Sequence, residues 1–179
     1  SAIRLPLRAC APSTTRLAAT RRASMLIRGV NSVGAITPGV RLHDLPQGTV
    51  EERIRMAGEL GFSCIQLPSK VLYASIGIDR CGLTRELAEH LRAVLDEAGV
   101  SVAVLGCYKN LATPDRQQLT DNFAEYEACL NFAQMLGGCP VGTETGRPNA
   151  QNCVADDRMT DEALDAFMDG LARVCECAE

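Results

Sequence analysis

The sequence has no apolar stretch approaching the roughly 20 residues that a membrane-spanning helix needs, so we expect no transmembrane segment. It also has no Cys-x-x-Cys pair, and its nine cysteines are an odd number. Several of them lie inside apolar strand or helix patterns, which favours reduced, mostly buried thiols over a disulfide framework or a zinc site. The composition, 46% apolar and 22% charged, is typical of about one soluble globular domain. We therefore expect a protein of the reducing cytoplasm.

Acidic residues are absent from the first 24 positions, which contain five arginines: Arg4, Arg8, Arg16, Arg21 and Arg22. The rest of the chain has 13 of the 18 basic residues and all 22 acidic ones, a formal charge of −9. This negative charge argues against nucleic acid as a partner, because nucleic-acid-binding surfaces are usually basic. The leader has the composition of an organelle transit peptide, but we favour the simpler interpretation that Met25 is the true start. In either case we expect residues 1–24 to be disordered and residues 25–179 to form the domain.

Three glycines recur at a spacing of 38 residues: Gly61, Gly99 and Gly137. Each follows an amphipathic, charged stretch and precedes an apolar run, as expected of a helix that ends in a left-handed glycine and leads into a buried strand. Alternating helices and strands with short links predict parallel strands joined by right-handed crossovers. The fold class is therefore α/β, and functional groups should lie at the carboxyl ends of the strands.

Four such units can be placed along the chain. Parallel strands, adjacent in sequence order, are expected at residues 25–30, 63–67, 101–105 and 139–143. Capping residues predict helices that begin after Thr49, Thr84, Asp115 and Thr160 and lie on one side of the strands. Residues 31–48 and 68–83 are expected to be loops. The last helix is expected to bury Leu164 and Met168.

The segment from Val141 to Asn149 contains the strongest candidate for chemistry, Glu144. This carboxylate is placed where an apolar strand ends, and the small residues around it leave space for a ligand. Such a glutamate can bind a hard divalent cation or move a proton from carbon next to a carbonyl. The alternative is a loop glutamate that caps an amide or pairs with Arg147. The local pattern leaves both interpretations open.

Two motifs place the chain beside a known family. They are Val-Gly-Thr-Glu-Thr-Gly at 141–146 and Gly-Cys-Tyr-Lys-Asn-Leu at 106–111, the latter followed by Pro114 and Asp115. Two shorter sequence segments, residues 29–32 and 59–62, point to the same family. The chain resembles the sugar phosphate isomerase/epimerase family of xylose isomerase-like TIM barrels from about Met25 to Glu179. The resemblance implies a parallel (β/α) barrel of TIM type, of which this chain holds the first four βα units.

The resemblance also implies an activity, the isomerisation or epimerisation of a small sugar, sugar phosphate or related polyol through an enediol-type proton transfer. In that family a divalent metal, often manganese, is held by Glu, Asp, His and Glu from four strands. Only Glu144 matches a ligand here, as the first glutamate and as a proton carrier, and the other three would lie on strands beyond Glu179. The metal could equally be magnesium, cobalt or zinc.

Three further side chains fall at the ends of predicted strands and could line a sugar pocket: Gln66, Tyr108 and Asn110. The alternative interpretations are that Tyr108 only packs at the rim of the pocket and that the amides of Gln66 and Asn110 are merely solvated.

Two rival functions follow from the same residues. A half-length barrel could be a non-catalytic module that dimerises or binds a partner through its open sheet edges, so self-association is expected. An apurinic endonuclease of the same superfamily would need a histidine-rich zinc cluster. We disfavour it, because His43 and His90 are the only histidines and neither ends a predicted strand.

Overall fold

The computed structural model describes residues 36–154 and 160–178. All the helices and strands described below lie in one compact unit, Thr37–Glu179. The expected leader at 1–24 and the expected first strand at 25–30 lie outside the described residues. In the described part of the chain, no helix is long and apolar enough to cross a membrane.

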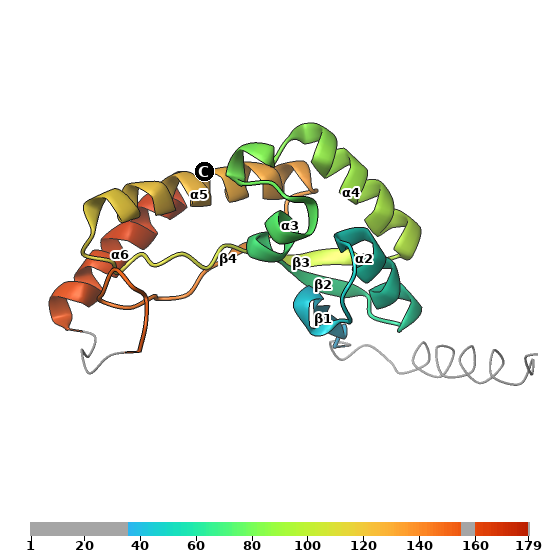
Figure 1. Ribbon diagram of the computed structural model, residues 1–179, viewed down its shortest axis with the longest axis horizontal. Helices are drawn as coiled ribbons and strands as arrows, with labels where there is room; N and C mark the ends of the chain where they lie inside the picture. Colours follow the sequence, from blue (N-terminus) through green and yellow to red (C-terminus); the bar gives the residue numbers. More distant parts are fainter. Residues whose placement is uncertain (1–35, 155–159, 179) are drawn as a thin grey trace, which may run out of the picture. The chain divides into compact units, whose positions relative to one another are not determined.

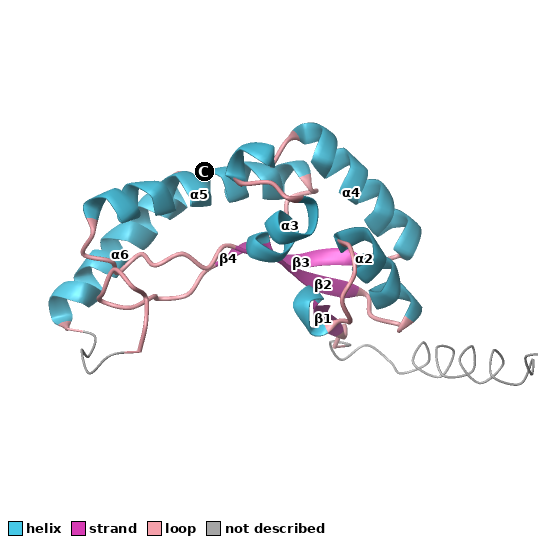
Figure 2. Cartoon of the chain, in the orientation of Figure 1, coloured by secondary structure: helices cyan, strands magenta, loops and turns pink. Residues whose placement is uncertain are grey.

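Four strands form one sheet in the order β1-β2-β3-β4, and each neighbouring pair is parallel (Figure 2). They are β1 (Gly39–Arg41), β2 (Cys64–Pro68), β3 (Ser101–Gly106) and β4 (Val141–Gly142). The predicted parallel sheet, with strands adjacent in sequence order, is confirmed for the last three strands. The sheet is consistent with part of a TIM barrel.

The strand β1 corrects the sequence prediction, which assigned residues 31–48 to a loop. Its three residues pair with Cys64, Ile65 and Gln66 of β2. A side chain at Gly39 would not fit, because an added Cβ would lie 2.7 Å from Cys64 Sγ. A strand this short, with a glycine and one partly buried valine, has no apolar run to reveal it.

The main helices begin at the predicted capping residues. They are α2 (Val50–Glu59), α4 (Arg85–Ala98), α5 (Arg116–Met135) and α6 (Asp161–Glu176). Thr49 and Glu52 form the reciprocal capping box, and Asp115 accepts hydrogen bonds from the backbone N–H groups of Gln117 and Gln118. Gly99 ends α4 in the left-handed conformation. These predictions are confirmed because each depends on residues a few positions apart.

Three short helical segments were not predicted. They are the 3-10 turns η1 (Leu42–Asp44) and η2 (Arg80–Gly82) and the helix α3 (Ser69–Ile76). The expected loop at 68–83 is therefore wrong over most of its length. The helix α3 follows β2 directly, and Pro68 is both the last residue of β2 and the N-cap of α3. A proline that ends a strand does not by itself distinguish a loop from a new helix.

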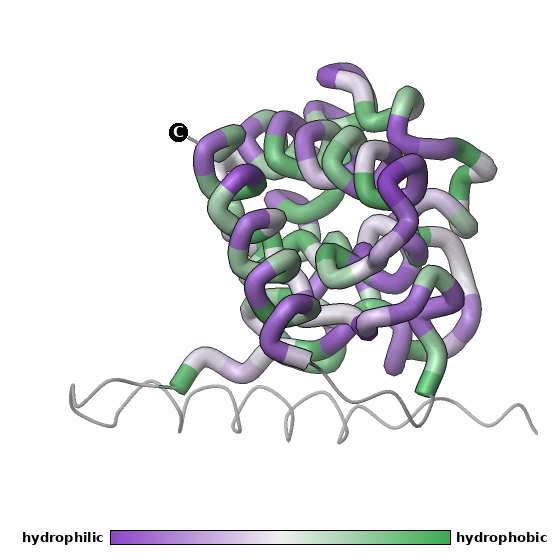
Figure 3. The backbone as a smooth tube through the Cα atoms, turned by 90° about the vertical axis from the view of Figure 1, so that its left-hand side faces the viewer, coloured by the Kyte–Doolittle hydropathy of each residue, from purple (hydrophilic) through white to green (hydrophobic). Residues whose placement is uncertain are grey.

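The core lies on one face of the sheet. Ile65, Leu67 and Leu105 of the strands are fully buried and belong to one cluster with buried residues of α2, α4 and α5, among them Ile54, Leu91 and Phe132. In Figure 1, α4 and α5 run along the top of the view with the sheet below them. Hydrophobic and hydrophilic residues alternate along the helices, as Figure 3 shows, so each helix turns one face to this core.

The other face of the sheet is open. Cys64, Gln66 and Val104 are only partly buried and alternate with the buried residues of the same strands. In a closed barrel this face would be the interior.

The helix α6 does not bury the residues predicted for it. Leu164 is 45% exposed and Met168 is 53% exposed. The helix instead turns Gly170 toward Leu111 and places Arg173 over the ring of Phe123, 4.1 Å from its centroid. An amphipathic pattern shows which side of a helix is apolar, but not which part of that side finds a neighbour.

All eight cysteines among the described residues are free thiols. Cys107 and Cys129 are buried, whereas Cys81, Cys153, Cys175 and Cys177 are exposed. Fewer of these cysteines are buried than the sequence predicted.

Candidate functional site

Two of the predicted site residues follow the carboxyl ends of their strands, and a third lies within a strand. Gln66 is the third residue of β2, Tyr108 lies two residues after β3, and Glu144 lies two residues after β4. In parallel α/β folds the carboxyl edge of the sheet is where loops from successive strands meet and form binding sites.

Gln66 and Tyr108 are in direct contact on the open face. The side-chain amide of Gln66 donates a hydrogen bond to the Tyr108 hydroxyl. The Tyr108 ring folds back over the end of β3, so that a Cβ on Gly106 would lie 2.5 Å from Cε2 of the ring. Tyr108 is still 37% exposed. The pair therefore presents one polar and one aromatic surface toward the open side of the sheet.

Asn110 has a different place from the one expected of a pocket-lining residue. It is 4% exposed, and its Nδ2 donates to the carbonyls of Arg147, at 2.8 Å, and Asn149, at 3.0 Å. Its Oδ1 accepts from the backbone N–H groups of Arg147 and Ala112, both at 3.0 Å. These four bonds use the full hydrogen-bonding capacity of the amide. Asn110 thus holds the loop after β4 in place.

Glycine is required where this loop passes Asn110. Gly146 has a φ of +79°, and an added Cβ would overlap Oδ1 of Asn110. The glycine that brackets Glu144 in the sequence motif therefore has a structural reason, the close approach of two loops.

Glu144 itself is exposed. Among the described residues, its carboxylate forms no hydrogen bond and no ion pair, and Arg147 is not its partner. Its backbone carbonyl accepts a bond of 3.2 Å from the Thr143 hydroxyl. The structure thus holds the backbone and leaves the carboxylate available to a ligand.

The described part of the chain does not hold a complete set of metal ligands. The described residues contain no group of three or more His, Cys, Asp and Glu side chains that could hold a metal ion. Hard divalent ions prefer about six oxygen ligands, and Glu144 offers a single carboxylate. The donor set present here is therefore incomplete for a metal site.

Tyr126 is a second link between the two loops, and the sequence analysis did not identify it. Its side chain is 1% exposed, its hydroxyl donates to the carbonyl of Lys109 at 3.1 Å, and it is hydrogen-bonded to the hydroxyl of Thr143. Burial raises the pKa of Tyr126 to about 12. A tyrosine in a buried stripe needs a polar partner, which is the one signal that could have revealed this role.

A buried carboxylate lies beside this link. Glu125 is 7% exposed, its Oε1 lies 3.8 Å from Nζ of Lys109, and this oxygen accepts no hydrogen bond. Burial, together with the Cys129 thiol and the Glu125 carboxylate nearby, raises the pKa of the Tyr73 hydroxyl. Sequence reasoning missed Glu125, although an acid beside a buried helix stripe is unusual.

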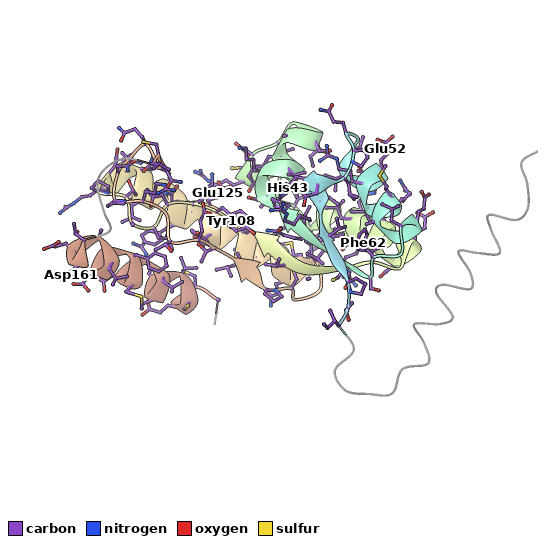
Figure 4. All side chains as sticks on the ribbon, turned by 90° about the horizontal axis from the view of Figure 1, so that it is seen from below. His43, Glu52, Phe62, Tyr108, Glu125 and Asp161 are labelled. Carbon is purple, nitrogen blue, oxygen red and sulfur yellow. The ribbon has the colours of Figure 1, made fainter. Side chains whose placement is uncertain are left out.

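A cleft of about 1000 Å³ opens at the same edge of the sheet. Its walls come from η1 and the turn after it, from α2, from α3 and from the end of β3. Figure 4 labels two of its lining residues, His43 and Tyr108. Tyr108 connects the cleft to β4, because an added Cβ on Gly142 would lie 3.8 Å from its hydroxyl oxygen.

Comparison with known proteins agrees with this architecture. The family model described as xylose isomerase-like TIM barrel matches residues 54–179. The chain belongs to this family. The match confirms the resemblance carried by the two sequence motifs, which both lie inside the matched region. No curated protein matches the chain.

Several solved structures of this family share the fold. D-psicose 3-epimerase with D-tagatose, from Clostridium cellulolyticum H10, is 14% identical, with a TM-score of 0.59 over 80% of this chain and 48% of that chain. 3-Keto-D-glucoside 4-epimerase from E. coli is 15% identical, with a TM-score of 0.58 over 80% of this chain and 52% of that chain. A xylose isomerase-like TIM barrel protein from Mycobacterium smegmatis, in complex with magnesium, is 19% identical, with a TM-score of 0.55 over 83% of this chain and 53% of that chain.

Identities this low show the fold alone. The chain spans about half the length of these solved structures. Four parallel strands in sequence order correspond to half of an eight-stranded barrel.

Proposed function

We propose that the protein isomerises or epimerises a small sugar, sugar phosphate or related polyol, and that Glu144 is the group of this chain that acts on the substrate. The observation that carries the proposal is the unpartnered carboxylate of Glu144 after β4, on a loop that Asn110 holds at both Arg147 and Asn149. Two of the similar structures are sugar epimerases by name, which supports the substrate class.

Glu144 would act as a proton carrier. Its carboxylate can take a proton from the carbon next to a substrate carbonyl, which leaves an enediol. Return of a proton to the same carbon from the opposite face gives the epimer, whereas protonation of the neighbouring carbon gives the isomer. Epimerisation needs a second proton-transferring group on the opposite face, and we expect it from outside the described residues.

The neighbouring side chains would hold the sugar. Gln66 and Tyr108 already share a hydrogen bond on the open face, and each keeps polar capacity for a sugar hydroxyl. The Tyr108 ring can pack against the apolar face of a sugar. Asn110 would act through the loop as a positioning residue, since its amide is fully engaged.

Metal dependence is a separate part of the proposal. A divalent ion, with manganese, magnesium, cobalt and zinc as candidates, would supply positive charge next to the substrate oxygens. Glu144 would be one ligand, and the others would have to come from outside the described residues. The proton transfer above is argued from Glu144 alone, because the donor set of this chain is incomplete.

Replacing Glu144 with Gln tests the proposal in the protein expressed from its full coding sequence. We expect turnover of ketose substrates to fall by about 10²–10⁴-fold, the usual contribution of a positioned acid or base, with an unchanged melting temperature. Calorimetry with Mn²⁺ should show weaker binding. The matched control is Glu89→Gln, an exposed carboxylate on α4. Full activity and full metal binding in Glu144→Gln would make Glu144 an ordinary loop residue.

A further inference from the structure

The cleft beside β2 and β3 is lined by basic and not by acidic residues. His43, Arg53, Lys70 and Lys109 are among the described residues that line it, and no Asp or Glu is among them. The surrounding chain has the opposite balance, since residues 25–179 contain 13 basic and 22 acidic groups. The basic lining therefore runs against the composition of the chain.

Two of these cations have no ion-pair partner in the part of the chain that the structure describes. His43 lies 3.7 Å from Asp44, and Lys109 lies 3.8 Å from Glu125. Arg53 and Lys70, in contrast, form no ion pair within residues 36–154 and 160–178.

Arg53 also has an unsatisfied donor. Its Nε is buried and has no hydrogen-bond acceptor, although the residue lines the cleft. A buried guanidinium donor without an acceptor is unfavourable, and other atoms of the same residue line the cleft.

The first turn of α3 opens into the same cleft. Pro68, Ser69, Lys70 and Val71 all line it. The N-cap Pro68 provides no side-chain hydrogen bond, and the first turn holds no acidic residue. The backbone N–H groups at a helix N-terminus favour an anion, and the residues of this turn line the same cleft as Arg53.

We propose that this cleft binds the anionic group of the substrate, a phosphate or a carboxylate, with Arg53 and Lys70 as its binding residues. For the sugar part of the substrate the inference rests on the proposed function. Tyr108 lines the cleft and reaches the end of β4, so an anion held here belongs to a substrate that extends toward Glu144. The substrate is thus a sugar phosphate or a sugar acid rather than a neutral sugar.

Binding of inorganic phosphate, measured by calorimetry on the 179-residue chain, tests the site without any need for turnover. Lys70→Gln and Arg53→Gln should each weaken phosphate binding by about tenfold, the effect expected for the loss of one charge-assisted hydrogen bond. The matched control is Arg92→Gln, an exposed base on α4 outside the cleft, which should bind phosphate as the unaltered chain does. If Arg53→Gln fails to fold, the exposed Lys70 decides the result alone.

A second set of titrations distinguishes the two anions. A pentose 5-phosphate, the matching sugar acid and the parent pentose are compared, and the charged ligand that fits should bind at least about tenfold tighter than the pentose. Equal affinities for all three, or unchanged phosphate binding in Lys70→Gln, would overturn the inference. Anion binding by a protein without epimerase activity would overturn the proposed function only, whereas turnover of neutral sugars without anion binding would overturn this inference only.

Discussion

The loops that follow β3 and β4 lie at the same edge of the sheet but are built in opposite ways. The β3 loop is packed from Asn110 on: Asn110, Leu111 and Thr113 are at most 4% exposed, whereas Tyr108 before them is 37% exposed. The β4 loop is open, and Glu144, Thr145 and Arg147 are exposed. Two side chains, Asn110 and Tyr126, join them. The hydrogen bonds to the β3 loop and to Tyr126 thus hold the β4 loop in place, so the unpartnered carboxylate of Glu144 can still have a defined position.

Asn110→Ala should loosen the β4 loop more than any other substitution considered below. The substitution removes four hydrogen bonds, two of them to Arg147, while the carbonyl of Asn149 keeps its bond of 3.2 Å from the backbone N–H of Asn152. We expect a loss of about 2–4 kcal/mol in the free energy of unfolding, measured by chemical denaturation. Hydrogen exchange should accelerate over residues 144–149.

The control for this prediction is Asn131→Ala, an exposed asparagine on the same helix as Tyr126, which should change stability little. An Asn110→Ala protein whose β4 loop exchanges as slowly as before would show that the loop has order of its own.

Gly146→Ala should push the two loops apart. The added Cβ meets Oδ1 of Asn110, in addition to the cost of a φ of +79°. Gly61→Ala is the matched control, because Gly61 has a φ of +87° and nothing within 4 Å of an added Cβ. We expect Gly146→Ala to be more destabilising by about 1–3 kcal/mol, from thermal or chemical unfolding. Equal losses in the two variants would mean that the contact with Asn110 relaxes freely.

Tyr126→Phe gives the smallest expected effect, about 1–2 kcal/mol, because one buried hydroxyl is removed and the ring stays. Its signature is a pH dependence. The pKa of Tyr126 is raised from 10.0 to about 12 in the folded protein, so the neutral hydroxyl stabilises the fold fully below pH 10. That contribution is lost as the pH rises from 10 to 12.

The stability difference between the unaltered protein and Tyr126→Phe should therefore shrink across this window, as measured by denaturation at several pH values. A constant difference from pH 8 to 12 would contradict a buried, neutral Tyr126.

Local signals in the sequence predicted the helices well. The capping box of Thr49 and Glu52 and the cap at Asp115 each depend on atoms within one helical turn, so a short pattern identifies them. The strand β1 and the helix α3 could not be found in the same way. The strand β1 has only three residues and pairs through its backbone. The helix α3 has Pro68 as its N-cap, and a proline at this position is equally typical of the end of a strand.

The candidate site was predictable only in part, because its contacts are distant in sequence. Glu144 could be located from the end of an apolar run and from its motif. The role of Asn110 depends on Arg147 and Asn149, 37 and 39 residues away. The basic cleft combines Arg53, Lys70 and Lys109 from three separate segments, and no pattern along the chain connects them.

The bonds of Asn110 also determine how this site could be transplanted. A designer who moved residues 143–149 alone into another barrel would carry over Glu144 but leave behind the amide that fixes Arg147 and Asn149. The smallest portable unit is the pair of loops, with Asn110 and Gly146 moved together. Because of the same coupling, a substitution in one loop alters its fit to the other. Substitutions in the two loops therefore have to be compatible with each other.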